Sequence, residues 1–209
     1  MHLRSDSFTP YATMSEQFAF GKHDPDQHCV LSDNQNPHLQ WSGAPDTTRS
    51  FVVLCWDPDV PTVGDDVNQA GKSVPLDLPR CDFFHWVLVD IPPHLGQIGE
   101  GSRSSGVSPR GKTPGVETGG GVTGINDYTG WFASDPDMSG DYGGYDGPCP
   151  PFNDERMHGY HFAVYALDVA SLKLSGSFTG AQVREAMKGH VLASATLVGL
   201  YAINPQARR

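Results

Sequence analysis

The 209-residue sequence lacks any apolar run of the roughly 18 residues that a membrane-spanning helix needs. Its first residues, MHLRSDSFTPYATM, contain no apolar core of a signal peptide. Basic residues are also few, with 14 Lys and Arg against 24 Asp and Glu, which gives a net charge of −10. This charge argues against nucleic acid or an anionic membrane surface as the main partner. We therefore expect a cytoplasmic protein without an integral membrane segment.

Cysteine is scarce as well, and the four cysteines show neither a Cys-x-x-Cys spacing nor a cluster with histidines in the sequence. They are Cys29, Cys55, Cys81 and Cys149. Free, structural thiols are the expectation, although one long-range disulfide stays open. No motif in the sequence calls for a cofactor.

Long Ala, Leu, Glu and Lys runs are missing, whereas 24 glycines and 17 prolines are present. This composition favours short strands joined by ordered turns. A hydrophobic content of 38% is enough for one sizeable core. We therefore predict a mainly β protein that forms a single domain over residues 1–209.

Apolar patterns predict the central strands. Ser50–Trp56 is a continuous β-branched and aromatic run, which is typical of a strand covered on both faces, and Phe83–Ile91 is expected to be the second buried strand. Leu39 and Trp41 alternate with polar neighbours and should point inward. Two later strands are expected over Tyr160–Leu167 and Val191–Tyr201, the last with a helix as its alternative.

One short helix is predicted in the C-terminal part, over residues 180–188. Thr179 has the character of an N-cap residue and Gly189 that of a helix terminator. The other segments read as loops: a polar turn at His23–Asp26, a long surface loop over residues 62–80, and a glycine-rich region over residues 96–150.

Asp57-Pro-Asp59-Val-Pro61 follows the first buried strand, and its prolines predict that the strand ends there. Carboxylates this close repel each other unless a proton, cation or hydrogen-bond donor lies between them. Asp57 and Asp59 are therefore candidates for a binding site. A capped turn, in which each carboxylate accepts bonds from local amides, explains them equally well.

Two histidines and a tyrosine are further candidates with ordinary alternatives. His85 and His158 could be core histidines, and Tyr160 could be a strand residue with its hydroxyl at the surface. The segment Tyr142–Pro151 is rich in glycine and proline, which suits a rigid pocket wall that a ligand can approach closely. A plain connecting loop is the alternative.

Together these segments resemble the phosphatidylethanolamine-binding protein family, in particular its bacterial and archaeal Raf-kinase-inhibitor-like branch. The similar segments cover most of the chain in the order of the family: Asn36–Pro45, Trp56–Pro61, Phe84–Pro92, Asn126–Tyr128, Gly144–Pro151, His158–Asp168 and Met187–Ala193.

The resemblance implies a β-sandwich of a large and a small sheet, with an anion pocket that takes phosphate or a phosphorylated lipid head group. The implied ligand-binding residues are Asp57, Asp59, His85, Gly147, Pro148, His158 and Tyr160. Two features depart from the family pattern. Residues 62–80 look like an insertion beside the pocket, and Gly159 stands where the family often has Arg.

The expected function is therefore binding of a small anion without catalysis, with regulation of a partner protein such as a kinase or protease as a further expectation. A homodimer is compatible with the resemblance. One alternative is a metal-assisted phosphate-ester hydrolase that uses Asp57 and Asp59. Another is a metal site formed by these two residues with His85 and His158.

Overall fold

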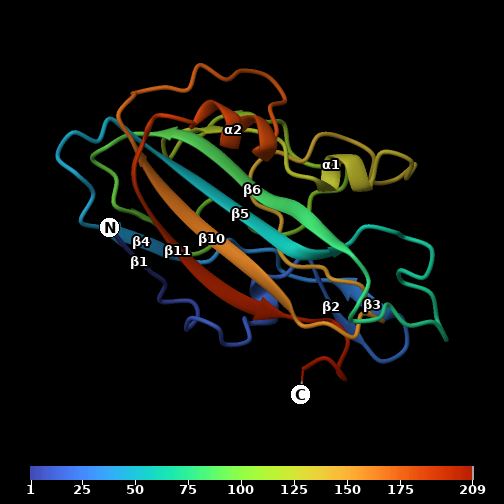
Figure 1. The fold of residues 1–209 in the computed structure, drawn as a ribbon. Coiled ribbons are helices and arrows are strands. Elements are labelled where there is room, and N and C mark those ends of the chain that lie inside the picture. The colour runs from blue at the N-terminus through green and yellow to red at the C-terminus, as the bar shows by residue number, and fades with distance from the viewer. Residues whose placement is uncertain (209) are drawn as a thin grey trace.

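The computed structural model describes residues 1–208, and its largest element is an antiparallel six-stranded sheet in the order β11-β10-β5-β6-β9-β8 (Figure 1). The long strands are β5 (Ser50–Pro61), β6 (Arg80–Ile91), β10 (His158–Leu167) and β11 (Val191–Tyr201). The short strands β9 (Val122–Thr123) and β8 (Gly115–Val116) complete one edge.

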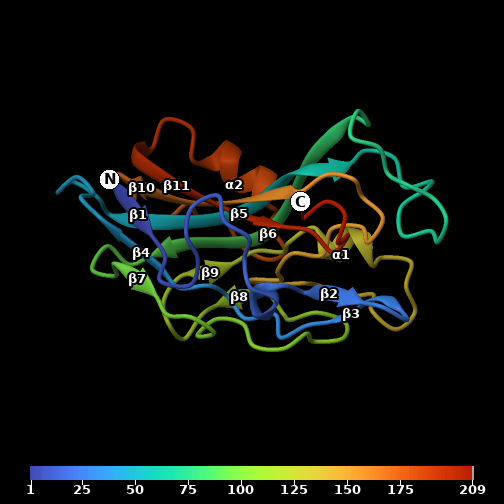
Figure 2. The same cartoon turned by 90° about the horizontal axis from the view of Figure 1, so that it is seen from below.

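A smaller sheet lies against one face of the large one, as the view from below shows (Figure 2). Its order is β1-β4-β7, formed by His2–Arg4, Leu39–Ser42 and Gln97–Ile98. A separate hairpin of β2 (Gly21–Asp24) and β3 (His28–Leu31) lies beyond its end, preceded by the 3-10 helix η1 (Glu16–Phe18). The predicted β-sandwich of a large and a small sheet is confirmed, with this hairpin as an addition.

Strand β5 is apolar on both sides because both faces of the large sheet are covered. Phe51, Val53 and Cys55 belong to the core between the two sheets, together with Leu39 and Trp41 of the small sheet. The intervening residues of β5 face a second core beneath helix α2. The apolar run over residues 50–56 is thus explained, as predicted, by a strand that is covered on both faces. Leu39 and Trp41 are buried, as expected.

Helix α2 (Gly180–Ala186) begins at the predicted cap. Thr179 and Gln182 form a reciprocal capping box, and Gly189 has the positive φ of +80° that allows the chain to turn back into β11. The glycine-rich region contains only one helix, α1 (Tyr128–Trp131). No helix within residues 1–208 is long and apolar enough to cross a membrane.

The predicted end of the first buried strand was wrong, since β5 continues through the proline motif to Pro61. The continuation contains a β-bulge: three steps from Asp57 to Val60 are matched by two steps from Phe83 to Cys81 in β6. Strand β10 pairs with β5 only as far as Trp56, so beyond that point β5 has one neighbour. Prolines are tolerated there because one edge needs no amide donors.

The predicted turn at His23–Asp26 was also partly wrong. His23 and Asp24 belong to strand β2, and the turn itself lies over residues 25–27. Asp24 Oδ1 accepts bonds from the amides of Asp26 and Gln27. The sequence signal came from this Asx-type turn, whose first residue is still part of the strand.

Candidate functional site

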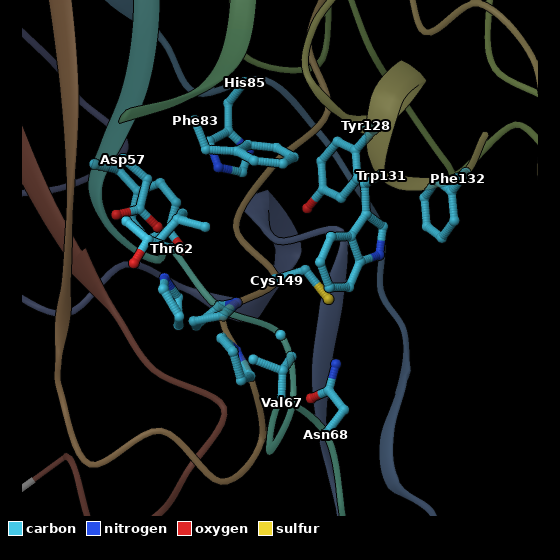
Figure 3. A pocket seen from close by; sticks show the side chains of 16 residues that line it. Asp57, Thr62, Val67, Asn68, Phe83, His85, Tyr128, Trp131, Phe132 and Cys149 are labelled. Atoms are coloured by element: carbon cyan, nitrogen blue, oxygen red, sulfur yellow. The ribbon is translucent and has the colours of Figure 1, made fainter. Parts of the chain in front are cut away.

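A cavity of about 260 Å³ lies where the bulged end of β5 and the first half of β6 meet the loop over residues 62–79, helix α1 and the segment after Pro148. Figure 3 shows the side chains that surround it. Its polar lining residues include Asp57, His85, Tyr128 and Tyr160. Apolar walls are formed by the side chains of Val60, Pro61, Val67, Phe83, Trp131, Phe132, Pro150 and Pro151.

Asp57 is 1% exposed, and both of its carboxylate oxygens are already bonded within the protein. Oδ1 accepts a bond of 2.7 Å from the amide of Asp59, across the bulge. Oδ2 lies 2.6 Å from Nδ1 of His158. The bulge therefore gives Asp57 a fixed orientation at the cavity.

His158 is fully buried between two carboxylates. Its Nε2 lies 3.1 Å from Oδ2 of Asp154, while Nδ1 contacts Asp57. Both nitrogens can donate only in the imidazolium form. Burial by itself would lower the pKa of His158, but the charge of Asp57 and the bonds to both carboxylates outweigh it and raise the pKa to about 9.

Arg80 completes a buried chain of alternating charges. Its guanidinium contacts both oxygens of Asp154, at 2.5 and 3.1 Å. Burial would raise the pKa of Asp154, yet the bonds from His158 and Arg80 lower it overall. In this chain Asp57 and Asp154 are balanced by His158 and Arg80, so the carboxylate at the cavity has a neutralising partner.

His85 lines the cavity from strand β6, which pairs with the strand that carries Asp57. Nδ1 lies 2.8 Å from the carbonyl oxygen of Asp146, which can only accept, so Nδ1 carries a proton. Within residues 1–208 Nε2 makes no hydrogen bond with favourable geometry. Burial lowers the pKa of His85, and a neutral imidazole with a free Nε2 lone pair results.

Tyr160 has a hydroxyl that is buried yet has no hydrogen-bond partner among residues 1–208. Asp57 lies near enough for its charge to act on the tyrosine, but the two groups lack the geometry of a hydrogen bond. Burial, and then the charge of Asp57, raise the pKa of Tyr160 well above its usual value. The hydroxyl is thus a protonated donor at the edge of the cavity.

The segment before Cys149 supports the wall of the cavity. Gly147 donates its amide to Asn34 and accepts the hydroxyl of Tyr128 at its carbonyl. A side chain here would collide with the carbonyl oxygen of Phe18, which explains the glycine. The carbonyl of Pro148 accepts the amides of residues 20 and 21, and the wall itself begins at Cys149.

The structure brings only some of the predicted site residues to the cavity, namely Asp57, His85 and Tyr160. Asp59 instead contacts Arg156 and the amide of Gly159. Gly147, Pro148 and His158 lie behind the lining, with the partners described above. The arrangement differs from the expected set of ligand-binding residues, because several of these residues use their polar atoms to hold neighbouring residues in place. A ligand-binding role for the set stays a prediction.

The sequence analysis gave no role to several other residues of the site. Tyr128 and Trp131 come from helix α1 and Phe132 is its C-cap residue, far along the chain from the strands they face. Tyr128 belonged to one of the motifs of the resemblance, so its position was noted without a function. Asp154 and Arg80 lack even such a signal, since their pairing joins residues 74 positions apart.

Comparison with known proteins shows the family of this chain. The family profile described as phosphatidylethanolamine-binding protein matches residues 4–202. A UPF0098 protein of Methanothermobacter thermautotrophicus is 33% identical over 85% of this chain and 89% of its own. One of Aquifex aeolicus is also 33% identical, over 90% of this chain and 85% of its own. This chain belongs to the phosphatidylethanolamine-binding protein family.

A solved structure shows the same fold. That of Escherichia coli YbcL, described as a member of the mammalian PEBP family, has a TM-score of 0.68 and 24% identity. The alignment covers 97% of this chain and 98% of YbcL. At this identity the match supports the architecture of the two sheets.

No observation favours the hydrolase alternative. Asp57 and Asp59 diverge, the first toward His158 and the second toward Arg156. The described residues hold no group of three or more His, Cys, Asp or Glu side chains arranged for a metal ion. The neighbours of β5 are both antiparallel, unlike the parallel sheets in which that chemistry usually occurs.

Proposed function

We propose that the cavity binds a small anion, most favourably a phosphate or phosphorylated head group, and that the protein acts by binding rather than by catalysis. The observation that carries this proposal is the unpartnered hydroxyl of Tyr160 beside the cavity. A buried donor without an acceptor costs about 1–3 kcal/mol, which an oxygen of a bound ligand would recover.

His85 adds a second contact whose chemistry depends on protonation. In the neutral ring Nε2 is an acceptor, so it would meet the P–OH group of a phosphate monoanion. After uptake of a proton it would donate to a fully ionised phosphate instead. In either case the complex holds one proton between His85 and the ligand. Affinity should therefore rise as the pH falls toward the ordinary pKa of histidine.

The walls of the cavity suit the remainder of such a ligand. Phe83, Trp131 and Phe132 offer aromatic surface, while none of the lining residues of the described chain is Lys or Arg. Selectivity for the anion would then come from uncharged hydrogen-bond donors and from the shape of the cavity. A protein of net charge −10 would attract an anion little over long distances. An apolar group attached to the phosphate would contact the aromatic side chains.

Calorimetric titration with phosphate, phosphoethanolamine and uncharged glycerol tests the proposal. Saturable binding of the two phosphates, with no binding of glycerol, is expected for the parent protein. His85→Ala should abolish it. His161→Ala is the matched control, because His161 stacks on Trp56 on the neighbouring strand and does not line the cavity. Equal phosphate binding by folded His85→Ala protein would contradict the proposal.

The expected regulation of a kinase or protease and the expected homodimer are separate from this proposal. They stay predictions.

A further inference from the structure

Two of the four free cysteines lie next to each other, although 120 positions separate them in the sequence. Cys29 comes from strand β3 and Cys149 from the wall of the cavity. Their sulfurs meet beside Gly21: a Cβ added to this glycine would lie 2.9 Å from Sγ of Cys29 and 2.6 Å from Sγ of Cys149. The missing side chain of Gly21 thus leaves the space in which the two thiols approach.

The backbone around this pair is held in place from both sides. Cys29 is paired with His23 in the β2–β3 hairpin, two residues along β2 from Gly21. The carbonyl of Pro148 accepts bonds from the amides of Phe20 (2.9 Å) and Gly21 (3.2 Å). The residue before Cys149 is therefore bonded to the strand that carries Gly21. This arrangement keeps the two sulfurs near each other without a covalent bond.

The two thiols differ in reactivity. A hydrogen bond from Cys149 lowers the pKa of Cys29, which is only partly buried. The same bond and burial raise the pKa of Cys149 well above its usual value. Cys55 and Cys81 have raised pKa values, in both cases mainly through burial. Of the four cysteines, Cys29 is thus the best placed to form a thiolate and attack.

We propose that Cys29 and Cys149 form a dithiol site, which small organic disulfides such as glutathione disulfide oxidise to an internal disulfide. In the first step the thiolate of Cys29 attacks one sulfur of the oxidant, whose S–S bond breaks and releases one thiol. Cys149 then loses its proton and attacks Sγ of Cys29 in the mixed disulfide, which releases the second thiol. The protein loses two electrons and two protons, and the oxidant is reduced to two thiols.

The site differs from the anion-binding function in what it requires. It needs only Cys29, Cys149 and a small disulfide, and no contact with Tyr160 or His85. Because Cys149 also lines the cavity, the bond would join the cavity wall to strand β3. A protein that failed to bind phosphate could still form this disulfide, so the two proposals fail independently.

Mass spectrometry of the full-length protein tests the site directly. The reduced protein is incubated with glutathione disulfide, remaining thiols are alkylated under denaturing conditions, and the protein is digested with trypsin. Each cysteine falls in its own peptide, over residues 23–49, 50–72, 81–103 and 113–156. The expected product is peptide 23–49 linked to 113–156, with an intact mass lower by about 2 Da and an abundance above that of any other pairing.

Single substitutions provide the controls, and thermal unfolding shows that each variant is folded. Cys29→Ser and Cys149→Ser should each abolish the linked product and leave at most a mixed disulfide with glutathione. Cys81→Ser is the matched control, because Cys81 is the most exposed thiol and lies on β6 away from the pair, and it should give the parental yield. Unlinked peptides, or a main product that contains Cys55 or Cys81, would overturn the proposal.

Discussion

Two sets of polar residues at the cavity, called its two sides below, are bonded in opposite ways. On the side of Asp57, every carboxylate oxygen and ring nitrogen of the buried chain has a partner within the protein. On the side of His85 and Tyr160, a ring nitrogen and a hydroxyl are left without one in the described chain. The first side is complete without a ligand, whereas the second is not. This contrast separates groups that build the cavity from groups that a ligand would satisfy.

The two buried histidines show the same contrast in their protonation. His85 has a lowered pKa because burial outweighs the neighbouring carboxylates and carbonyls, while the pKa of His158 is raised to about 9 because two carboxylates bonded to its ring outweigh burial. Burial acts in the same direction on both rings. The number of ionised neighbours decides the outcome, so one imidazole is neutral and the other charged at pH 7.

The largest expected effect comes from breaking the complete side. His158→Leu removes the cation between Asp57 and Asp154 and leaves two buried carboxylates with a single cationic partner. Loss of one member of a buried ion pair costs about 3–5 kcal/mol. Urea unfolding at pH 7 should show a decrease of this size in the free energy of unfolding.

An exposed pair of the same residue types is the control for this substitution. His190 and Asp168 lie 2.9 Å apart with 44% and 45% of their side chains exposed. His190→Leu should change the free energy of unfolding by no more than about 1 kcal/mol. Similar losses for the two variants would show that His158 gains nothing from its buried neighbours.

The next effect is the pH dependence that His158 confers. The ordinary pKa of histidine is 6.5, and that of His158 in the folded protein is about 9. The folded state binds this proton more tightly, so the stabilisation is complete below pH 6.5 and is lost as the pH rises from 6.5 through about 9. Its full size is about 3 kcal/mol. Urea unfolding of parent and His158→Leu at pH 6, 7.5 and 9 measures it.

The comparison of the two proteins removes the contribution of other groups that titrate in this range. The stability difference between parent and variant should be largest at pH 6 and shrink toward pH 9. His85 acts with the opposite sign, because its lowered pKa gives a stabilisation that is lost as the pH falls through 6.5. A parent–variant difference that stays constant from pH 6 to 9 would argue against a protonated His158.

The smallest effect concerns the incomplete side. Tyr160→Phe removes a buried hydroxyl without a partner, so the free energy of unfolding should rise by about 1 kcal/mol, because the desolvation cost of that hydroxyl disappears. Affinity for phosphate should nevertheless fall about tenfold, as expected for one lost hydrogen bond of about 1.4 kcal/mol. Urea unfolding and calorimetric titration give the two values.

Tyr145→Phe sharpens this comparison, since Tyr145 is equally buried but its hydroxyl donates to the carbonyl of Phe18 at 2.7 Å. It does not line the cavity. It should lose about 1–2 kcal/mol of stability and keep its phosphate affinity. If both variants changed stability alone, Tyr160 would be a structural residue like Tyr145.

The fold was largely predictable because its signals are local. Continuous or alternating apolar residues specified the central strands, and Thr179 with Gly189 specified the limits of α2. The bulged end of β5 escaped prediction, because tolerance of Pro58 depends on which side of the strand lacks a neighbour. That is a property of the sheet and cannot be read from the motif itself.

The site was predictable only in part for the same reason. The resemblance placed Asp57, His85 and Tyr160 in one region, and they do line one cavity. It could not tell a ligand contact from a supporting residue such as His158, because that distinction depends on Asp154 and Arg80. The aromatic wall from α1 also depends on how the glycine-rich region folds back onto the sheet.

The long loop over residues 62–79 is fastened at several places to the body of the protein. Arg80 donates to the carbonyl of Pro75, and the side chain of Asn153 bonds to the backbone of Asn68 and three further residues, 66, 69 and 72. Beyond these attachments, much of the loop is exposed.

Because the loop is attached at these positions, its length could vary between them. The closure entropy of a loop grows only slowly with its length, so residues could be added or removed between the fastened positions at little cost. The part of the cavity that β5, β6 and β10 form, called its floor here, would not have to change with it. Relatives that share the floor could thus differ in the size of the cavity entrance, and one scaffold could serve ligands of different length.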